Sequence, residues 1–220
     1  MKVSIIVPVY NEEKTIEKVI VEIKKVPIEK EIIVVDDGSS DRTKEILKNI
    51  EDIKTIFFDK NQGKGSAIRA GLKLATGDIV IIQDADLEYN PFDYLKLLKP
   101  FLKYGENIAV YGSRFKGDGK FLFLSKLANI ILNFFTNLFF SSKISDMETC
   151  YKVLPRKMIL SLNLKSKRFE IEPEITAKLL KKKIKIIEVP ISYQARKAGK
   201  KIKPKDGIIA LFTLLYYRMA

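Results

Sequence analysis

The sequence has no histidine, no tryptophan and one cysteine among its 220 residues. Without histidine, the chain cannot use a histidine general base, a Ser-His-Asp triad or a zinc site with histidine ligands. Its one cysteine, Cys150, cannot form an intramolecular disulfide or supply an all-cysteine zinc site, and it fits a reducing compartment. Residues 1–10 lack the long apolar core and the cleavage site of a secretory signal, so we expect a buried strand there.

Positive charge is in excess and is unevenly distributed. Forty Lys and Arg oppose 27 Asp and Glu, which gives a formal net charge of +13. Residues 178–220 hold twelve of these basic residues and only two acidic ones, Glu188 and Asp206. A basic segment of this kind favours an anionic partner, which can be nucleic acid, a membrane surface or a phosphorylated small molecule. A solvated, lysine-rich surface is the alternative.

Strand and helix patterns alternate through the first 110 residues. Short apolar, β-branched runs predict strands, and apolar residues every three or four positions predict helices. This alternation is typical of an α/β fold with a mostly parallel sheet, in which ligands bind beyond the carboxyl ends of the strands. The predicted strands are Val3–Val9, Glu31–Asp36, Ile53–Phe58, Asp78–Gln83 and Ile108–Gly112, and the predicted helices are Glu12–Lys25, Asp41–Asn49, Lys64–Ala75 and Pro91–Lys103.

Clustered carboxylates follow the fourth predicted strand. Asp84 and Asp86 stand one residue apart, and Glu88 follows two residues later. Hard cations such as Mg²⁺ and Mn²⁺ prefer oxygen ligands, and such an ion neutralises charge on a leaving phosphate. We therefore expect Mg²⁺ or Mn²⁺ at Asp84 and Asp86, with Glu88 as a third ligand or as a group that orients a water. Solvated acids in a turn are the alternative.

Two further loops carry polar residues at predicted strand ends. Residues 36–39 (DDGS) form either a turn with a capping serine or a place where an aspartate binds a base or ribose. Residues 61–65 (NQGKG) precede a helix, where glycines permit close backbone approach and the helix N-terminus favours anions. A glycine-rich capping turn is the alternative there. The chain has neither the Walker A spacing nor a Gly-x-Gly-x-x-Gly after its first strand, which disfavours a dinucleotide-binding domain.

Several segments together resemble a known family. SIIVPVYNEE, IVVDDGSSDRT, NQGKGSAIRAG and QDADLEYNP occur in this order and look like glycosyltransferase family 2, a nucleotide-sugar-dependent group with a GT-A fold. YGSRF, SDMETCYKV and EVPISYQAR are similar to the polyprenyl-phosphate glycosyltransferases of the dolichol-phosphate mannose synthase type. The resemblance implies one domain, in which residues 1–115 form a nucleotide-sugar-binding half and residues 116–220 an acceptor- and membrane-facing half.

The resemblance implies a role for individual residues on the donor side. Related synthases more often have glutamine at the position of Glu88, which weakens its assignment as a ligand. The residues expected to bind the nucleotide sugar are Pro8, Tyr10 and Glu12 at the base, Asp37 at the base or ribose, Lys64, Asp84, and a mobile basic segment with Arg196, Gly199 and Lys201 that closes over the diphosphate.

The resemblance also implies roles on the acceptor side. Arg114 matches an arginine that meets the acceptor phosphate, and Lys126 stands where mannose synthases often carry arginine. Lysine offers a point charge rather than a planar fork, so its hold on a phosphate is looser. Asp146 matches a catalytic acid or its neighbour. Asp86, Arg114 and Asp146 are therefore the predicted catalytic residues.

Residues 121–140 (FLFLSKLANIILNFFTNLFF) predict an amphipathic helix. The segment is long enough to span a bilayer, but its polar residues fall on one stripe, which favours an interface or a protein contact. We expect this helix to lie against the membrane surface, and a core or dimer-interface helix is the alternative. The polar residues are Ser125, Lys126, Asn129, Asn133, Thr136 and Asn137.

A second apolar segment, Ile208–Tyr217, follows the basic stretch Arg196–Lys205. An apolar helix beside a basic patch is a two-part peripheral anchor. Many members of the resembled group carry C-terminal transmembrane helices, and none follows here. We therefore expect peripheral attachment to the cytoplasmic face of the membrane, a membrane partner subunit, a homo-oligomer, or a sequence that is part of a longer protein.

The implied reaction is inverting transfer of a sugar, with mannose or glucose favoured, from a GDP- or UDP-sugar to a polyprenyl or dolichyl phosphate. A phosphate monoester is largely ionised at neutral pH, since its second pKa is near 6, so no strong general base is needed. A family 2 enzyme of cell-envelope polysaccharide synthesis, with a saccharide hydroxyl as acceptor, needs a base such as Asp146 or Glu148. A nucleotidyltransferase or a non-catalytic membrane or nucleic-acid module fits the polar loops less well, and we expect no nucleic-acid partner.

Overall fold

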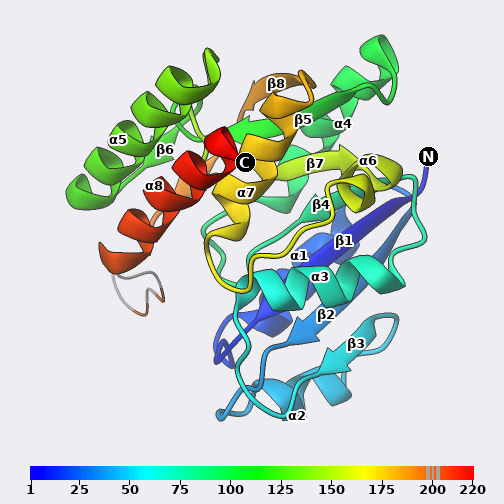
Figure 1. The fold of residues 1–220 in the computed structure, drawn as a ribbon. Helices are drawn as coiled ribbons and strands as arrows, with labels where there is room; N and C mark the ends of the chain where they lie inside the picture. Colours follow the sequence, from blue (N-terminus) through cyan, green and yellow to red (C-terminus); the bar gives the residue numbers. More distant parts are fainter. Residues whose placement is uncertain (197–198, 200, 202–203) are drawn as a thin grey trace.

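A computed structural model describes residues 1–196, 199, 201 and 204–220. Its centre is a seven-stranded sheet with the strand order β3-β2-β1-β4-β7-β5-β8 (Figure 1). β7 pairs antiparallel with β4 and β5, and the other neighbours are parallel, which confirms the predicted α/β class. The strands are β1 (Val3–Val9), β2 (Lys30–Asp36), β3 (Lys54–Phe57), β4 (Ile79–Ile82), β5 (Ile108–Ser113), β7 (Lys152–Pro155) and β8 (Lys185–Pro190).

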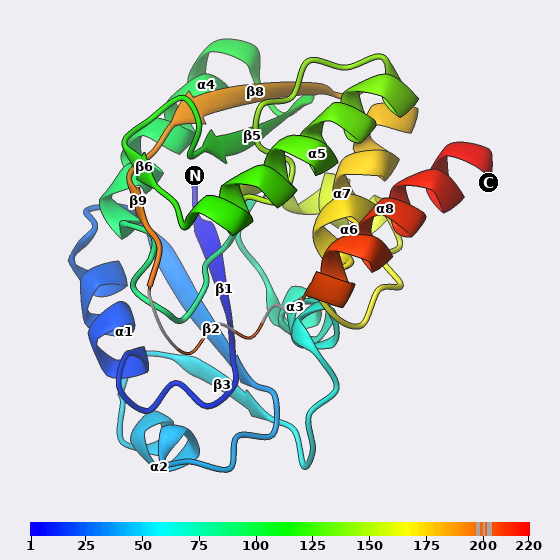
Figure 2. The same cartoon turned by 90° about the vertical axis from the view of Figure 1, so that its left-hand side faces the viewer.

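Helices cover both faces of this sheet, with α1 and α4 on one side and α3 and α7 on the other (Figure 2). The predicted helix from Glu12 begins at Ile16 instead, because residues 12–15 form a turn. A small parallel pair of strands, β6 (Gly119–Lys120) and β9 (Tyr193–Gln194), lies apart from the sheet. The helices are α1 (Ile16–Lys25), α2 (Thr43–Lys48), α3 (Lys64–Leu74), α4 (Tyr94–Tyr104), preceded by the 3₁₀ turn Pro91–Asp93, α5 (Phe123–Phe140), α6 (Arg156–Ser161), α7 (Ile171–Lys181) and α8 (Pro204–Met219).

The core forms because the central strands are apolar on both faces. Every residue of β1 and β4 is buried, as expected for strands covered by helices on both sides. α1 buries the face that its sequence spacing predicts, with Ile16, Ile20 and Ile23 packed into this core. α5 and α8 pack on each other and on α7, around a smaller apolar cluster.

The antiparallel strand β7 decides where the polar loops meet. β7 runs opposite to its neighbours, so its first residue lies at the edge where β4 and β5 end. Residues 145–151, just before β7, therefore join the loops that follow β1, β2, β4 and β5. Strands from residues 1–115 and 116–220 thus share one sheet and build one edge together.

Glu31 ties four parts of the sheet together at the opposite edge. Its side chain, only 8% exposed, accepts hydrogen bonds from Ser4 Oγ at 2.6 Å and from the Thr76 backbone N–H at 2.6 Å. Lys54 Nζ lies 2.8 Å from the other carboxylate oxygen. Burial opposes ionisation, but the Lys54, Ser4 and Thr76 contacts together hold the pKa of Glu31 well below its usual range. β1, β2, β3 and the loop before β4 therefore depend on one ionised carboxylate.

Replacing Glu31 by glutamine should lower the free energy of unfolding by about 1–3 kcal/mol at neutral pH, because charge-assisted hydrogen bonds are lost. The pKa of Glu31 is lower in the folded chain than in the unfolded chain, so its stabilisation is complete above pH ~5 and is lost as the pH falls further. Urea titrations of both proteins should show a difference that shrinks below pH ~4. The exposed control Glu29→Gln should match the parent. A Glu31→Gln difference that is constant with pH would contradict this assignment.

Candidate active site

The loops at the carboxyl edge of the sheet gather acidic and basic side chains that are far apart in the sequence. Residues 10–12 follow β1, residues 84–88 follow β4, and Arg114 follows β5. The segment before β7 and the segment after β9 complete the site. Most of its charged side chains are partly or fully buried, so each needs a partner of opposite charge.

Arg196 holds the acidic side of the site together. Its Nη1 atom donates to both carboxylate oxygens of Glu12 at 2.9 and 3.0 Å, and Nη2 lies 3.6 Å from Asp86 Oδ2. The Arg196 backbone N–H donates to Glu88 Oε1 at 2.7 Å, while the Tyr193 hydroxyl donates to Oε2 of the same glutamate. The Glu88 carboxylate thus anchors the start of the basic segment, and metal binding there competes with both contacts.

Lys201 approaches the same loop from the basic segment. Its Nζ atom donates to the Asn11 carbonyl oxygen at 3.0 Å, lies 3.8 Å from Glu12 and sits 5.5 Å from the centre of the Tyr10 ring. Gly199 has a φ of +75°, a conformation that favours glycine. Residues 197–198, 200 and 202–203 of the predicted basic stretch lie outside the described residues. The predicted residues Glu12, Arg196 and Lys201 do meet.

A chain of alternating charges leads from Asp84 into the interior. Lys64 Nζ lies 2.8 Å from Asp84 Oδ1 and 2.9 Å from Glu172 Oε1. Glu172 is in turn 2.7 Å from Lys152 Nζ, a fully buried ammonium that also donates to two backbone carbonyls. Burial opposes the charge of Lys64, but Asp84 and Glu172 raise its pKa well above the usual value. Lys64 therefore acts as a fixed cation beside Asp84.

Asp37 is committed to the loop before α3. Its carboxylate accepts hydrogen bonds from the backbone N–H groups of Gln62 and Gly63 at 2.6 and 2.8 Å, and from the Asn61 side chain at 2.9 Å. Burial, the largest influence, raises the pKa of Asp37, and these amide contacts oppose the rise. Pro8 is buried in β1 nearby. Asp37 thus fixes the conformation of residues 61–63.

The N-terminus of α3 is filled by protein. The Gly65 and Ser66 N–H groups donate to the carbonyl oxygens of Arg168 and Lys167 at 3.2 and 2.9 Å. Gly63 has a φ of +97°, and a Cβ there would collide with the Lys167 carbonyl. The glycines of NQGKG thus permit close approach of the 166–168 segment, and the capping alternative holds for this helix end.

Arg114 and Asp146 form a buried ion pair at the other side of the site. Arg114 Nε and Nη2 donate to the two oxygens of Asp146 at 2.8 and 2.7 Å, and the Arg114 backbone N–H adds a third hydrogen bond. The guanidinium also lies 5.0 Å from the Tyr193 ring centre and 5.4 Å from that of Phe121. Such stacking and bidentate pairing fix the planar guanidinium in one orientation.

Lys126 and Asn129 are both on α5, but they behave differently. Lys126 is exposed, whereas Asn129 Oδ1 lies 3.5 Å from Arg114 Nη2. Glu148 lies nearer the centre, with its Oε1 atom buried and without a hydrogen-bond partner among the described residues. Burial raises the pKa of Glu148 to about 7, against the opposing charge of Lys152.

The donor set suits a divalent cation only in part. Among the described residues, no three carboxylate, cysteine or histidine side chains cluster closely enough to hold a metal. Burial and the charges of Asp84 and Glu88 raise the pKa of Asp86 to about 7. A cation beside Asp86 would relieve this repulsion, and the hard oxygens of Asp84 and Asp86 match Mg²⁺ or Mn²⁺. The fit therefore requires further oxygen ligands from outside the chain.

The helix α5 has its polar side toward the protein and its apolar side toward solvent. Asn133 donates to the Ser145 carbonyl at 2.5 Å and accepts from Met147 N–H at 2.8 Å, and Asn137 makes the same pair of contacts with Ile144. By contrast, the outward side chains are apolar, and Phe134 is 61% exposed. Two residues of the predicted polar stripe, Asn133 and Asn137, therefore hold the segment before β7, whereas Lys126 of the same stripe is exposed.

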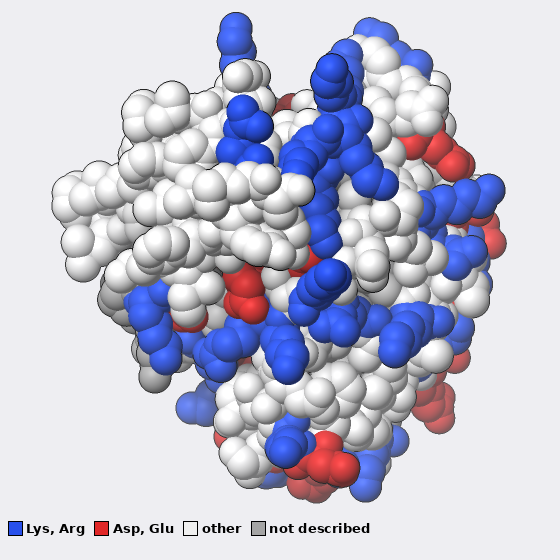
Figure 3. Space-filling view, in the orientation of Figure 1, with Lys and Arg blue, Asp and Glu red and all other residues white. Residues whose placement is uncertain are grey.

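α8 extends this apolar surface. In Figure 3 the surface over α5 and α8 is almost wholly white, and a band of Lys and Arg crosses the molecule below it. α5 is also the one described helix that is long and apolar enough to cross a membrane, with a mean hydropathy of 1.3, which is weak evidence alone. Its exposed apolar neighbours on α8 are Ile208, Ile209, Phe212, Tyr216 and Met219.

Comparison with known proteins identifies the family. The model of Glycosyl transferase family 2 matches residues 4–162. The chain belongs to this family. The resemblance drawn from the sequence motifs is therefore confirmed.

This family 2 chain is 34% identical over 93% of its length to a dolichol-phosphate mannosyltransferase of Pyrococcus furiosus, of which it spans only 60%. It is 31% identical over 86% of its length to a UDP-N-acetylglucosamine–dolichyl-phosphate N-acetylglucosaminyltransferase of Methanococcus voltae, of which 84% is covered. A solved structure of glucosyl-3-phosphoglycerate synthase from Mycobacterium tuberculosis, with Mn²⁺, UDP and phosphoglyceric acid, shares the fold with a TM-score of 0.76 at 21% identity. The structural match covers 99% of this chain and 78% of the synthase, which supports the GT-A-like architecture.

Sequence reasoning missed two buried members of the site. Glu172 and Lys152 complete the charge chain behind Asp84, yet Glu172 lies in an ordinary acidic helix turn and Lys152 opens an apolar strand. Only a lysine within a strand of otherwise apolar residues gives a local signal, because a buried lysine needs an acidic partner.

Asp146→Asn should destabilise the protein by about 3–5 kcal/mol, because it leaves the Arg114 guanidinium buried without its counter-charge. Urea denaturation followed by circular dichroism measures this change. The exposed control Asp118→Asn should differ from the parent by less than about 0.5 kcal/mol. Equal stability of Asp146→Asn and the parent would show that the pair is not held in a buried environment.

Proposed function

We propose that this protein transfers a sugar from a GDP- or UDP-sugar to a polyprenyl phosphate at the cytoplasmic face of a membrane. The observation that carries the proposal is the position of Arg114. Its guanidinium is fixed at the sheet edge and touches Asn129 of α5, the helix whose outer side is apolar. A phosphate-binding cation at the junction of a nucleotide-side loop cluster and an apolar surface suits a lipid phosphate.

The donor is expected on the side of the site formed by the loops after β1, β2 and β4. Asp84 and Asp86 would hold a divalent cation there, which when bound neutralises charge on the departing nucleoside diphosphate. Arg196 and Lys201 reach the same place and supply fixed positive charge. The relatives named above use dolichyl phosphate by name, and this supports the same acceptor class here.

The acceptor side needs orientation more than proton transfer. A phosphate monoester is already an anion at neutral pH, so Arg114 can bring its oxygen into line with the anomeric carbon without a strong base. The new bond forms between that oxygen and the sugar while the sugar–diphosphate bond breaks, so the anomeric configuration inverts. Asp146 contributes by holding Arg114, through two hydrogen bonds below 3 Å.

The apolar surface of α5 and α8 suits a bilayer interface. Exposed apolar patches of this kind mark membrane or protein contacts, and basic residues beside them attract anionic lipid. The polyprenyl chain of the acceptor must itself stay in the bilayer, which places the Arg114 side of the site against the membrane. Peripheral attachment through this surface satisfies both needs, with a partner subunit or homo-oligomer as the alternative cover.

A second candidate acceptor is a saccharide hydroxyl, and Glu148 is the observation that favours it. A hydroxyl must lose its proton, and the Glu148 carboxyl lies near Arg114 and Lys64, with a buried Oε1 atom that has no hydrogen-bond partner among the described residues. Glu148→Gln separates the two acceptors. It should abolish transfer to a hydroxyl but should change transfer to a phosphate by only a few-fold, as the latter needs no base.

The direct test incubates the protein with Mn²⁺, a short polyprenyl phosphate and labelled GDP- or UDP-sugars, and counts label in the organic phase. We expect label from one donor, with a loss of about 100-fold or more in Asp86→Ala because charge on the leaving group is no longer stabilised. Asp118→Asn is the matched control. Metal-dependent release of nucleoside diphosphate without lipid label would rule out the lipid acceptor.

Membrane attachment should depend on the outer side of α5 and α8. The double substitution Phe134→Asp and Phe212→Asp should reduce co-sedimentation with anionic phospholipid vesicles by about tenfold or more, since each places a charge in apolar contact. Leu102→Asp, at a still more exposed apolar position on α4, should leave binding unchanged.

Light scattering of the same proteins gives their oligomeric state and so tests whether a second copy covers the apolar surface. The apolar surface would be assigned to a second copy if the parent is a dimer in solution and the double variant is a monomer that binds vesicles as the parent does.

A further inference from the structure

We propose that Glu188 is a positioning residue that fixes the acceptor-phosphate side of the site, an inference that rests on the proposed function. Glu188 lies on β8, and its side chain is only 5% exposed. Its Oε1 atom accepts hydrogen bonds from the Ser145 N–H and hydroxyl, each at 2.8 Å, and from the Asp146 N–H at 3.0 Å. One carboxylate oxygen thus gathers three donors from the turn that carries Asp146.

These contacts connect Glu188 to the arginine through one intermediate. Asp146 holds Arg114 by two side-chain hydrogen bonds and one backbone hydrogen bond. Ser145 also shares a hydroxyl contact of 2.7 Å with Ser113, the residue before Arg114. Glu188 therefore fixes the backbone at Ser145 and Asp146, and through them the position of Arg114. It does not itself touch the expected phosphate.

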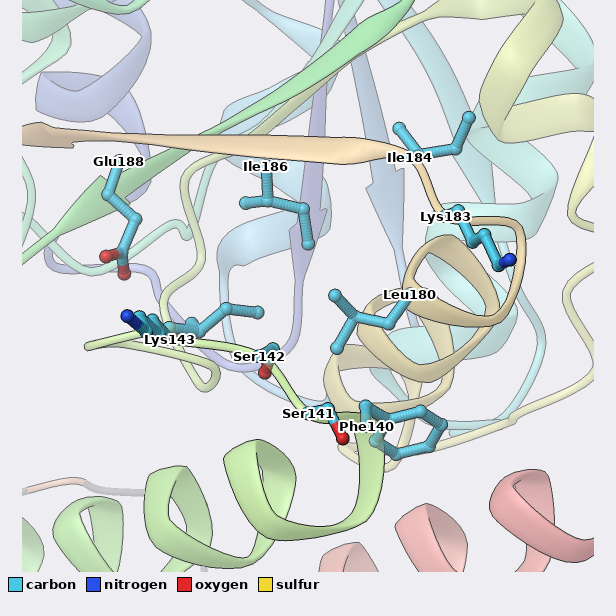
Figure 4. Close-up of a pocket in the computed structure, with 10 residues that line it drawn as sticks. Phe140, Ser141, Ser142, Lys143, Leu180, Lys183, Ile184, Ile186 and Glu188 are labelled. Atoms are coloured by element: carbon cyan, nitrogen blue, oxygen red, sulfur yellow. The ribbon is translucent and has the colours of Figure 1, made fainter.

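A cavity lies beside this carboxylate, behind the turn that it holds. A cavity of about 350 Å³ lies between β8, the end of α7 and the segment after α5. Figure 4 shows side chains that line it. Glu188 projects from β8 toward the segment that carries Ser142 and Lys143. On the side of this cavity the hydrogen bonds of Glu188 hold the turn, and Asn133 of α5 adds contacts with Ser145 and Met147.

The second oxygen of Glu188 provides a matched control. Its Oε2 atom lies 2.7 Å from Lys116 Nζ, and the Lys116 side chain is 47% exposed. Lys116→Met removes this surface ion pair but leaves all three contacts with Ser145 and Asp146 in place. Glu188→Ala removes both sets, whereas Glu188→Gln keeps an acceptor oxygen for the turn. The three variants together separate positioning of the turn from simple loss of a surface charge.

The kinetic test measures kcat and KM for a short polyprenyl phosphate, with GDP or UDP affinity determined by calorimetry. Glu188→Ala should lower kcat/KM for the acceptor by about 10- to 100-fold, because Arg114 is no longer held in line. Its affinity for the nucleoside diphosphate should equal that of the parent. Glu188→Gln should recover most of the loss, and Lys116→Met should match the parent. Equal losses on the donor and acceptor sides would overturn the proposal, since a purely structural defect has that effect.

A second readout does not depend on turnover. The Arg114 Nε–H group donates to Asp146, so it should give a protected side-chain signal in a ¹⁵N NMR spectrum, assigned by its loss in Arg114→Lys. This signal should shift or broaden in Glu188→Ala and persist in Lys116→Met. If the parent transfers no sugar to lipid, the proposed function fails while the signal still decides the role of Glu188. An unchanged signal in Glu188→Ala would overturn the positioning role.

Discussion

The buried ion pair between Arg114 and Asp146 is the interaction on which the rest of the site depends. Arg114 follows β5 and Asp146 lies in the segment before β7, and each is almost completely buried. A buried guanidinium without its counter-charge is costly, so the chain must keep β5 and the segment before β7 in register. The antiparallel direction of β7 makes this possible, because it brings residues 145–151 to the edge where β5 ends.

The orientation of α5 follows from the same requirement. The segment before β7 makes few contacts with other backbone, so asparagine side chains of α5 supply its hydrogen bonds. Turning these polar side chains inward leaves the apolar side of α5 facing outward. One side of α5 thus holds the segment that carries Asp146, and its other side forms the apolar surface. Site geometry and surface character are therefore coupled through one helix.

The first 110 residues were largely predictable, because their periodicity and turn chemistry are local signals. The apolar runs of β1 and β4 and the buried face of α1 follow directly from residue spacing. β7 was not predicted, since four residues beginning with lysine resemble a loop until Glu172 is seen to neutralise that charge. The motif resemblance assigns Glu12, Arg196 and Lys201 to donor binding, and their mutual contacts are a finding of the structure. The partners of Glu88 and Lys64 likewise depend on tertiary pairing that no local pattern encodes.

Charge compensation explains how so many ionised side chains share one site. Arg196 lies against Glu12 and Asp86, and Lys64 lies against Asp84. In the proposed reaction the basic side chains would bind the nucleoside diphosphate, and Asp84 and Asp86 would hold its cation, in exchange for their present partners. Neither charge is favourable alone, because a bare diphosphate meets Asp84 and Asp86 and a bare cation meets Lys64 and Arg196. The two are therefore expected to bind together, so that the ion pairs within the site break only when the donor is in place.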